Sequence, residues 1–306
     1  MQPLPYLPPD TIRKYNSKLM DIFSLYMNLL PTAVDGAAVE ELAADCNMPT
    51  AEAFAHYLAA IMGLDAGGED RLFFQYWLLP SIREQSPSAY TGDAYFQSIK
   101  IPSDMRGKWT LKTESLQPFE AFVCNDIVVT EDRRMIPQIG FFKETYTFPA
   151  VLENGREWMT LLPNEMVTSY PAINAAHGRV LTFGLGLGFF AYHASQKENV
   201  ESVTVVDISD DVIDLFQTHI LPQFPHKEKI TIVKMDAFDF AEQKMQGNFD
   251  FLFADIWHDA GDGCDLYLRF KELEPRFPEI EFTYWLEDTL KCYLDKTLWD
   301  LPSTSQ

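Results

Sequence analysis

The sequence predicts an α/β fold in which a parallel sheet carries helices on both faces, with an N-terminal helical region and a small β-hairpin region ahead of it. From residue 179 onward, short apolar runs alternate with helical runs, the pattern of a parallel sheet that is buried on both faces. Before residue 90, apolar residues recur instead at helical spacing. The length of 306 residues is enough for about two domains.

The N-terminal region, residues 1–90, is predicted to be helical. Leu19, Phe23 and Tyr26 give a first helix one apolar face, and Pro49 divides residues 34–64 into two short helices. A third, aromatic helix over 72–79 is expected to stop at Pro80. The second of the two short helices offers none of the Arg, Lys, Asn or Gln side chains that read bases. We therefore expect a packing or homodimerisation module and no nucleic-acid reader.

Residues 91–162 are predicted to form a linker and a small β region. The stretch 81–105 is rich in Ser, Pro, Gly and Asp, which is typical of a linker. Two β-prone runs, 146–152 and 156–162, flank Asn154-Gly155. An Asn-Gly pair favours a two-residue hairpin turn because both turn residues need positive φ. We therefore predict a hairpin at this point.

The third domain, residues 163–306, is predicted to hold the parallel sheet. A helix is expected from Pro163 to Ala176, with Asn164 as its N-cap and Glu165 in its first turn. Little chain remains after the last predicted strand and helix, so we expect the sheet to be truncated at its C-terminal edge and completed by the N-terminal region or by a partner. The predicted strands are 180–183, 202–206, 230–234, 249–254 and 280–284, and the helices between and after them are 189–195, 211–220, 266–273 and 286–294.

Charge and cysteine usage narrow the classes of partner. The chain has 24 Lys and Arg against 45 Asp and Glu, a net charge of −21. This acidity argues against binding to a nucleic-acid backbone or to an anionic membrane surface. It favours a small, cationic or neutral partner, although solubility is the simpler cause. Four well-separated cysteines and an opening stretch without a secretory leader predict a cytoplasmic protein.

The segment Gly184-Leu-Gly186-Leu-Gly188 directly follows the strand predicted at 180–183. Its glycines allow a sharp turn and a close approach of backbone to a ligand. The next predicted strand ends at Asp207, 19 residues beyond Gly188. An acid at that spacing is placed to accept hydrogen bonds from ribose hydroxyls. The alternative is a loop carboxylate that binds no ligand.

Two further acids follow predicted strands. Asp236 comes after the strand at 230–234, and Asp255 comes after the strand at 249–254. Ligands of open parallel sheets bind beyond the carboxyl ends of the strands, so the glycine segment and all three acids are expected along one edge. The glycine spacing differs from the dinucleotide-binding G-x-G-x-x-G pattern, so a nucleoside ligand is expected rather than a dinucleotide.

Taken together, these motifs resemble the class I methyltransferases that use S-adenosylmethionine, over about residues 160–290. The resemblance implies a Rossmann-like sheet in which the three glycines pass along the methionine part of the cofactor. It implies that Asp207 binds the ribose diol with Ile208 beside the adenine. It also implies that Asp236 accepts from the adenine amino group near the Ala237 backbone, and that Asp255 faces the methionine end and the substrate. The activity expected is methyl transfer to a small molecule or an unidentified acceptor.

The hairpin ahead of the glycine segment is similar to the polyamine-synthase branch of this fold, the spermidine synthase-like proteins. That resemblance implies transfer of an aminopropyl group from decarboxylated cofactor to a diamine. The sequence departs from that branch in lacking a Tyr-His pair ahead of the glycine segment and in the loop that begins Asp255-Ile-Trp-His-Asp259. Aminopropyl transfer is therefore kept as an alternative. A non-catalytic module for cofactor binding or assembly is a third.

Catalytic candidates are Asp255, His258 and Asp259, which share one loop after a predicted strand. A base is needed only if the nucleophile must lose a proton. An imidazole titrates near neutrality, so His258 is suited to that role, although a surface histidine is the simpler interpretation. No metal site is predicted, because the acidic run at 262–265 lacks the ligand spacing of a calcium loop.

Overall fold

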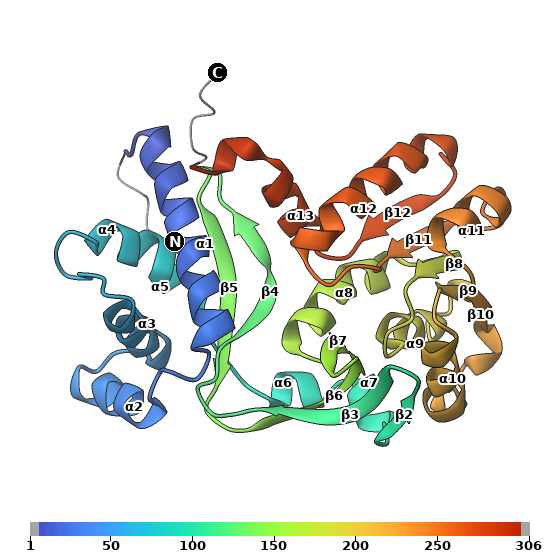
Figure 1. Cartoon of the computed structure of the whole chain (residues 1–306), viewed down its shortest axis with the longest axis horizontal. Helices are drawn as coiled ribbons and strands as arrows, with labels where there is room; N and C mark the ends of the chain where they lie inside the picture. The colour runs from blue at the N-terminus through green and yellow to red at the C-terminus, as the bar shows by residue number, and fades with distance from the viewer. Residues whose placement is uncertain (1–5, 301–306) are drawn as a thin grey trace. The chain divides into compact units, whose positions relative to one another are not determined.

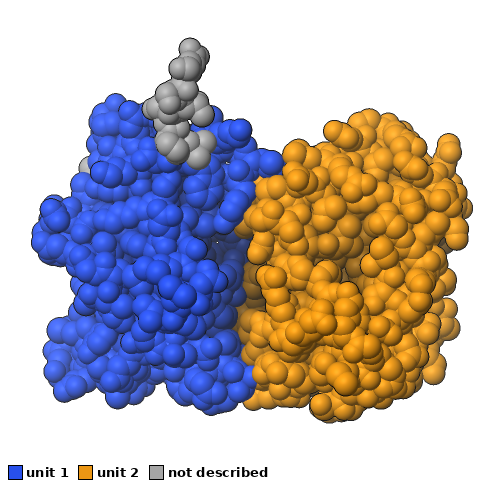
Figure 2. Space-filling model, viewed as in Figure 1, with its two compact units in different colours: residues 1–87, 115–146, 291–306 blue, residues 88–114, 147–290 orange. Residues whose placement is uncertain are grey.

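The computed structural model describes residues 6–300 (Figure 1). Residues 1–5, part of the opening stretch searched for a secretory leader, lie outside the described residues. The chain forms two compact units, coloured separately in Figure 2: unit 1 comprises residues 1–87, 115–146 and 291–306, and unit 2 comprises residues 88–114 and 147–290. Both units are discontinuous in sequence. The three continuous domains expected from the sequence remain a prediction.

Unit 1 combines N-terminal helices with a small sheet. A π-helical turn, Phe74–Leu78, joins α4 to α5, so that one uninterrupted helical run holds Pro80 close to its C-terminal end at Ser81. The predicted stop at Pro80 is therefore wrong, because the helix continues two residues beyond the predicted end at residue 79. The elements are α1 (Pro9–Leu29), α2 (Gly36–Asp45), α3 (Thr50–Ile61), α4 (Arg71–Phe73), α5 (Leu79–Ser81), β1 (Ile82–Gln85), β4 (Phe122–Val129) and β5 (Met135–Phe142).

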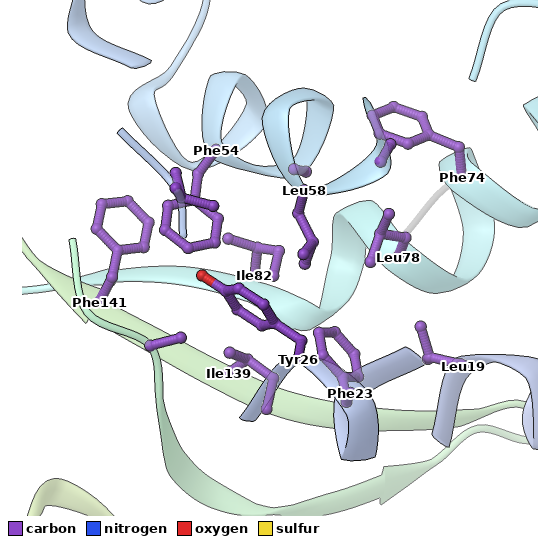
Figure 3. Packing of buried hydrophobic residues seen from close by; sticks show 14 of the residues in the cluster. Leu19, Phe23, Tyr26, Phe54, Leu58, Phe74, Leu78, Ile82, Ile139 and Phe141 are labelled. Atoms are coloured by element: carbon purple, nitrogen blue, oxygen red, sulfur yellow. The ribbon is translucent and has the colours of Figure 1, made fainter. Parts of the chain in front are cut away.

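The core of unit 1 lies between these helices and the sheet, as Figure 3 shows. Phe54 on α3 stacks on Phe141 of β5 with ring centroids 4.5 Å apart. The sheet has the order β1-β5-β4, and Ile82 of β1 pairs in parallel with Ile139 of β5. The expectation of a linker over 81–105 is thus wrong at β1. This four-residue strand is stabilised by a partner more than fifty residues away, which local composition does not reveal.

Unit 2 contains the parallel sheet and most of a smaller sheet of order β2-β3-β6-β7. Strands β3 and β6 and helix α13 continue across the boundaries between the units. The elements are α6 (Ser88–Thr91), α7 (Ala94–Ser98), β2 (Asp104–Arg106), β3 (Trp109–Leu116), β6 (Tyr146–Glu153), β7 (Arg156–Thr160), α8 (Pro163–Ala175), β8 (Gly178–Phe183), α9 (Phe189–Ser195), β9 (Val200–Asp207), α10 (Asp210–Leu215), β10 (Ile230–Lys234), α11 (Ala237–Lys244), β11 (Phe251–Ala254), α12 (Ala260–Leu273), β12 (Glu281–Tyr284) and α13 (Glu287–Leu294).

The predicted hairpin is confirmed. Strands β6 and β7 pair antiparallel, with Glu153 opposite Arg156. The two turn residues, Asn154 and Gly155, have φ of 52° and 80°, as a tight two-residue turn requires. The hairpin brings β7 close to the loop that follows β8, which matters for the site below.

The predicted parallel sheet is also confirmed. Its order is β10-β9-β8-β11-β12, and all neighbouring strands run parallel. Helices cover both faces. On one face Phe183 of β8 stacks on Phe270 of α12, with ring centroids 5.5 Å apart. On the other face Phe190 of α9 packs on Phe253 of β11, with ring centroids 4.6 Å apart. The fold is therefore the Rossmann-like α/β class expected.

The truncation expected at the C-terminal edge is present in the described residues, where β12 is the last strand on that side. The N-terminal region does not complete the sheet, contrary to one expectation, because its strand β1 pairs with β5 in a separate sheet. Among residues 6–300, no helix combines the length and the apolar character that a membrane crossing requires.

Candidate functional site

The site lies where the strand order reverses. From β8 the chain proceeds outward to β9 and β10 on one side, and then returns to place β11 and β12 on the other. Such a switch point leaves a crevice beyond the carboxyl ends of the two central strands, and ligands of open α/β sheets bind there. The glycine segment follows β8, and Asp255 follows β11, so the two flank this crevice.

A cavity of about 450 Å³ opens at this edge of unit 2. The structure brings most of the predicted site residues together in its wall. Gly188 instead borders a separate, much smaller hollow behind the glycine segment. The predicted residues that line the large cavity are Gly184, Gly186, Asp207, Ile208, Asp236, Ala237 and Asp255. Their roles toward a cofactor remain a prediction.

The glycine segment is shaped by its packing against neighbouring elements. Gly184 has φ of 96°, and a Cβ there would overlap the backbone oxygen of Asp255. Gly186 has φ of 48°, and a Cβ there would overlap the sulfur of Met159 on β7. At Gly184 glycine is thus required by close approach to backbone as well as by conformation, whereas the atom that Gly186 approaches belongs to a flexible side chain. The ends of β8 and β11 can meet only because Gly184 has no side chain.

Asp207 ends β9 and closes one side of the cavity. Its Oδ1 accepts the N–H of Ser209 at 2.8 Å, and its Oδ2 accepts the N–H of Leu185 at 3.1 Å. Burial raises the pKa of this carboxyl group, although the backbone hydrogen bonds act in the opposite direction. Each carboxylate oxygen can accept about two hydrogen bonds. Asp207 is therefore oriented by the backbone and keeps acceptor capacity for hydroxyl groups of a ligand.

Asp236 and its neighbours form the β10 end of the cavity. Oδ1 of Asp236 accepts from the N–H groups of Phe238 and Asp239 at 2.8 and 3.1 Å, and so caps α11. Both bonds use one oxygen, which leaves Oδ2 for a ligand. Ala237 begins α11. The side chain of Ile208 is 68% exposed at the cavity wall, so it offers an apolar surface to whatever enters.

Glu165 is a site residue that the sequence analysis missed. It lines the cavity together with Asp255. Burial raises the pKa of Asp255 to about 7. Burial, followed by the neighbouring Asp255, raises the pKa of Glu165 well above its usual value. Two buried carboxyl groups that are neighbours resist simultaneous ionisation, unless a cation lies between them.

The position of Glu165 follows from the start of α8. The helix begins at Pro163 with Leu162 as its N-cap, so the predicted cap at Asn164 is wrong, whereas Glu165 in the first turn is confirmed. Proline is favoured at the first helical position because its missing N–H has no intrahelical partner there. The sequence places Glu165 only in the first turn of a helix, and no motif links this residue to Asp255, ninety residues later in the chain.

Four tryptophans from different elements line the same cavity: Trp109, Trp158, Trp257 and Trp285. The rings of Trp109 and Trp158 meet edge to face at 5.4 Å. The indole N–H groups of Trp109 and Trp257 are buried and have no hydrogen-bond partner within the described part of the chain. Aromatic faces beside carboxylates favour a cationic ligand. Lys108, the basic residue among the described lining residues, forms an ion pair with Glu153.

The structure does not bring His258 or Asp259 into the wall of the cavity. His258 Nδ1 lies 2.8 Å from Asp262 Oδ2, and its ring packs edge-on against Trp158 with centroids 4.0 Å apart. Asp259 is exposed and caps α12 by accepting from the N–H of Gly261. The geometry therefore gives Asp259 a capping role, and it places His258 behind a cavity-lining tryptophan. Their predicted catalytic roles have no support from position.

Comparison with known protein families gives a match over the segment that holds the site. Residues 161–271 match the spermine/spermidine synthase domain. Among solved structures, a match is described as "a putative sam-dependent methyltransferase from Streptococcus mutans", with 18% sequence identity and a TM-score of 0.31. That match covers 42% of this chain and spans 36% of the length of the solved structure. No curated protein matches the chain. The segment that holds the glycine loop and the three strand-end acids is thus similar to a spermine/spermidine synthase domain, the branch that the sequence resemblance indicated.

Proposed function

We propose that unit 2 is a transferase that binds an adenosyl sulfonium nucleoside and alkylates the nitrogen of a small cationic amine. The observation that carries this proposal is the shared cavity. It joins Asp207 at the end of β9 to the carboxyl pair Glu165 and Asp255 at the β11 end. Hydroxyl acceptors at one end and paired carboxyl groups at the other suit a nucleoside beside an amine.

The residues present fit the nucleoside. Asp207 keeps acceptor capacity for a ribose diol, and Asp236 keeps one carboxylate oxygen beside the apolar surface of Ile208. The sulfonium supplies an alkyl carbon: the amine nitrogen forms a bond to this carbon, its bond to sulfur breaks, and the electron pair stays on sulfur. For such a displacement the protein mainly contributes alignment.

The carboxyl pair provides the remaining chemistry. An amine reaches the cavity as an ammonium ion and must lose a proton before its nitrogen can attack. Burial raises the pKa of Asp255 to about 7, which suits a group that exchanges protons near neutrality. Asp255 would take the proton from the ammonium group, while Glu165 and the tryptophan faces hold the amine in place.

Two transferred groups are compatible with this proposal. Methyl transfer is the candidate that the glycine and acid motifs indicate. The sequence also lacks the Tyr-His pair of the polyamine synthases, which counts against the other candidate. Aminopropyl transfer is the second candidate. It is favoured by the match of residues 161–271 to the spermine/spermidine synthase domain. The charge of the cavity also favours it. Two carboxyl groups are available to a cationic amine, and Lys108, the basic residue among the described lining residues, is already paired with Glu153.

The experiment has a binding arm and a turnover arm. Calorimetry measures binding of S-adenosylmethionine, of its decarboxylated form and of methylthioadenosine to the purified chain. Mass spectrometry then detects alkylated products from a panel of mono-, di- and triamines with each sulfonium. We expect binding that disappears in Asp207→Ala, and a mass gain that identifies the transferred group.

The matched control is Asp210→Ala. Asp210 is an exposed acid three residues from Asp207, outside the cavity, and pairs with Lys234 at the surface. It is expected to bind nucleosides as the wild type does. Absence of binding at millimolar nucleoside, with no difference between wild type and Asp207→Ala, would refute the proposal. Binding without any product would support the non-catalytic alternative.

A further inference from the structure

We infer that the small hollow behind the glycine segment binds an ordered water molecule, held by Ser169 and Thr182, and that this water orients the carboxyl group of Asp255. The water site stands on the packing within unit 2 alone. Its consequence for proton transfer rests on the proposed function, which gives that step to Asp255. Ser169 and Thr182 are then positioning residues, which act on the site without touching its ligands.

The hollow has room for a water and polar groups to hold it. Its volume is about 20 Å³, whereas a water needs roughly 10–15 Å³ and at least about two polar partners. Three lining residues carry a side-chain oxygen: Ser169, Thr182 and Asp255. The other lining residues have hydrocarbon side chains or none, apart from the thioether of Met159. Hydrocarbon alone would leave such a hollow dry, but these three oxygens favour water.

Three elements bring these oxygens to one place. Thr182 on β8 pairs with Phe253 on β11, and paired residues of neighbouring strands share a face of the sheet. Asp255 comes two residues after Phe253, so the alternation of side chains directs it to the same face. On α8, Ser169 lies one turn after Glu165 and therefore on the same side of the helix. The hollow thus lies where α8 and α9 meet the carboxyl ends of β8 and β11.

The two hydroxyl groups are available to a water. Ser169 is 3% exposed and Thr182 is 2% exposed. Ser195, another buried serine of unit 2, donates its hydroxyl to the backbone oxygen of Tyr192 at 2.8 Å. Ser169 and Thr182 form no such side-chain bond within residues 6–300. A buried hydroxyl without a partner is costly, so both groups favour a water that they share.

Asp255 is the group on which this water acts. It lines both the hollow and the large cavity, so one side of the carboxyl group can meet the water while the other meets the amine. Burial raises the pKa of Asp255 to about 7. A water that donates to the carboxylate favours the ionised form. Without the water, the pKa of Asp255 would therefore be higher still.

The charged groups that share a cavity with Asp255 lie on the other side, in the wall of the large cavity. Among the described lining residues they are the acids Glu165, Asp207 and Asp236 and the ion pair of Lys108 with Glu153. In the wall of the hollow, as far as the structure describes it, Asp255 is the only group that titrates. A change at Ser169 or Thr182 therefore alters the hydrogen bonding of Asp255 and leaves the charges around it in place.

The first measurement is a high-resolution crystal structure of the chain without ligand. We expect an ordered water within hydrogen-bond distance of Ser169 Oγ, Thr182 Oγ1 and the Asp255 carboxyl group. Thr182→Val has nearly the same shape but no hydroxyl. Combined with Ser169→Ala, it is expected to lose this water.

The second measurement is the titration of Asp255, followed by NMR of isotopically labelled aspartate carboxyl groups and assigned with Asp255→Asn. We expect Ser169→Ala combined with Thr182→Val to raise the pKa of Asp255 by about one unit, the effect of one hydrogen bond to a charged group. Thr182→Ser keeps the hydroxyl and is expected to titrate as the wild type does. Ser195→Ala is the matched control, because it removes a buried hydroxyl that bonds elsewhere. Thermal unfolding midpoints verify that each variant is folded.

The outcomes distinguish this inference from the proposed function. The inference is overturned by any of three results: no ordered water in the hollow of the wild type, an unchanged titration in the double variant, or a shift in Thr182→Ser as large as that in Thr182→Val. Both measurements use the chain without nucleoside, so failure to bind any nucleoside would refute the proposed function and leave the inference standing.

The pH profile of turnover tests the consequence for proton transfer. Asp255 accepts a proton only when it is ionised, so a higher pKa moves the acidic limb of the profile to higher pH. We expect this limb to move in the double variant by the same amount as the titration of Asp255. An unmoved limb, with the titration shifted, would contradict Asp255 as the proton acceptor.

Discussion

Oδ2 of Asp207 accepts the backbone N–H of Leu185 at 3.1 Å, which ties the tip of β9 to the glycine segment after β8. This bond makes one residue responsible both for the shape of the segment and for the nucleoside end of the cavity. Asp207→Asn has nearly the same size but loses the negative charge. We expect it to bind methylthioadenosine at least about tenfold more weakly, as calorimetry will measure, because hydrogen bonds to a charged acceptor are worth about 1.5–3 kcal/mol.

The control for this prediction is Asp255→Asn at the other end of the same cavity. Methylthioadenosine has ribose and adenine but no amino-acid chain, so it has nothing to place beside Asp255. We expect this variant to bind it within about twofold of the wild type, a difference of roughly 0.4 kcal/mol. Equal losses in the two variants would contradict the assignment of the nucleoside to the Asp207 end.

The pair Glu165 and Asp255 makes stability depend on pH. Burial raises the pKa of both groups in the folded chain. A carboxyl group with a raised folded-state pKa favours folding below its unfolded pKa, and this contribution is lost as pH rises through the folded pKa. We therefore expect Glu165→Gln to be more stable than wild type above about pH 8, by on the order of 2 kcal/mol, with little difference below about pH 4, where the carboxyl group is protonated in both states. Urea unfolding across this range measures it.

Glu242→Gln is the control, because Glu242 is an exposed glutamate in the same unit. It is expected to follow the wild-type stability at every pH. A diamine that joins the two carboxyl groups should also abolish the advantage of Glu165→Gln at high pH. An advantage of the same size at pH 4 and pH 8 would show that shape, and not ionisation, causes the difference.

Gly184→Ala is expected to destabilise unit 2 strongly. The residue has φ of 96°, and a Cβ would overlap the backbone oxygen of Asp255. The matched control is Gly247→Ala, where φ is 71° but nothing lies within 4 Å of the added Cβ. The control isolates backbone strain, which costs on the order of 1 kcal/mol. We expect Gly184→Ala to lower the free energy of unfolding by at least about 3 kcal/mol. Equal losses of stability in Gly184→Ala and Gly247→Ala, measured by thermal unfolding, would show that the overlap contributes nothing.

The parallel sheet was predictable because its signals are local. Strands such as 230–234 are short apolar runs between helices, and the Asn154-Gly155 turn specifies its own hairpin. Strand β1 was not predictable from composition, because Ile82 acquires its role only by pairing with Ile139.

Some residues of the candidate site were likewise predictable from the sequence, and others were not. Asp207, Asp236 and Asp255 were predictable because each follows a strand of one parallel sheet, and carboxyl ends of parallel strands share an edge. Glu165 and Met159 were not, since one lies in the first turn of α8 and the other on a hairpin strand. Their proximity to the cavity depends on how these elements pack, and no local spacing encodes that.

The side chain of Asn16 on α1 is fully buried and uses all its hydrogen-bonding capacity. Its Oδ1 accepts from the indole N–H of Trp77 at 2.9 Å and from the N–H of Met135 at 3.0 Å. Its Nδ2 donates to the carbonyl oxygens of Arg133 and Leu298, each at 3.0 Å. One amide thus links α1, the aromatic helical segment, strand β5 and the chain near residue 298 within unit 1.

Asn16→Ala leaves these four partners without this bond, and three of them, on Trp77, Met135 and Leu298, are buried. Each unsatisfied buried group costs about 1–3 kcal/mol before relaxation. We expect a loss of roughly 3–4 kcal/mol in the free energy of unfolding, measured with urea. Asn28→Ala is the matched control on the same helix, because Asn28 is exposed and donates only to Ser24. It should cost less than about 0.5 kcal/mol. Similar midpoints for the two variants would show that the buried amide does not hold unit 1 together.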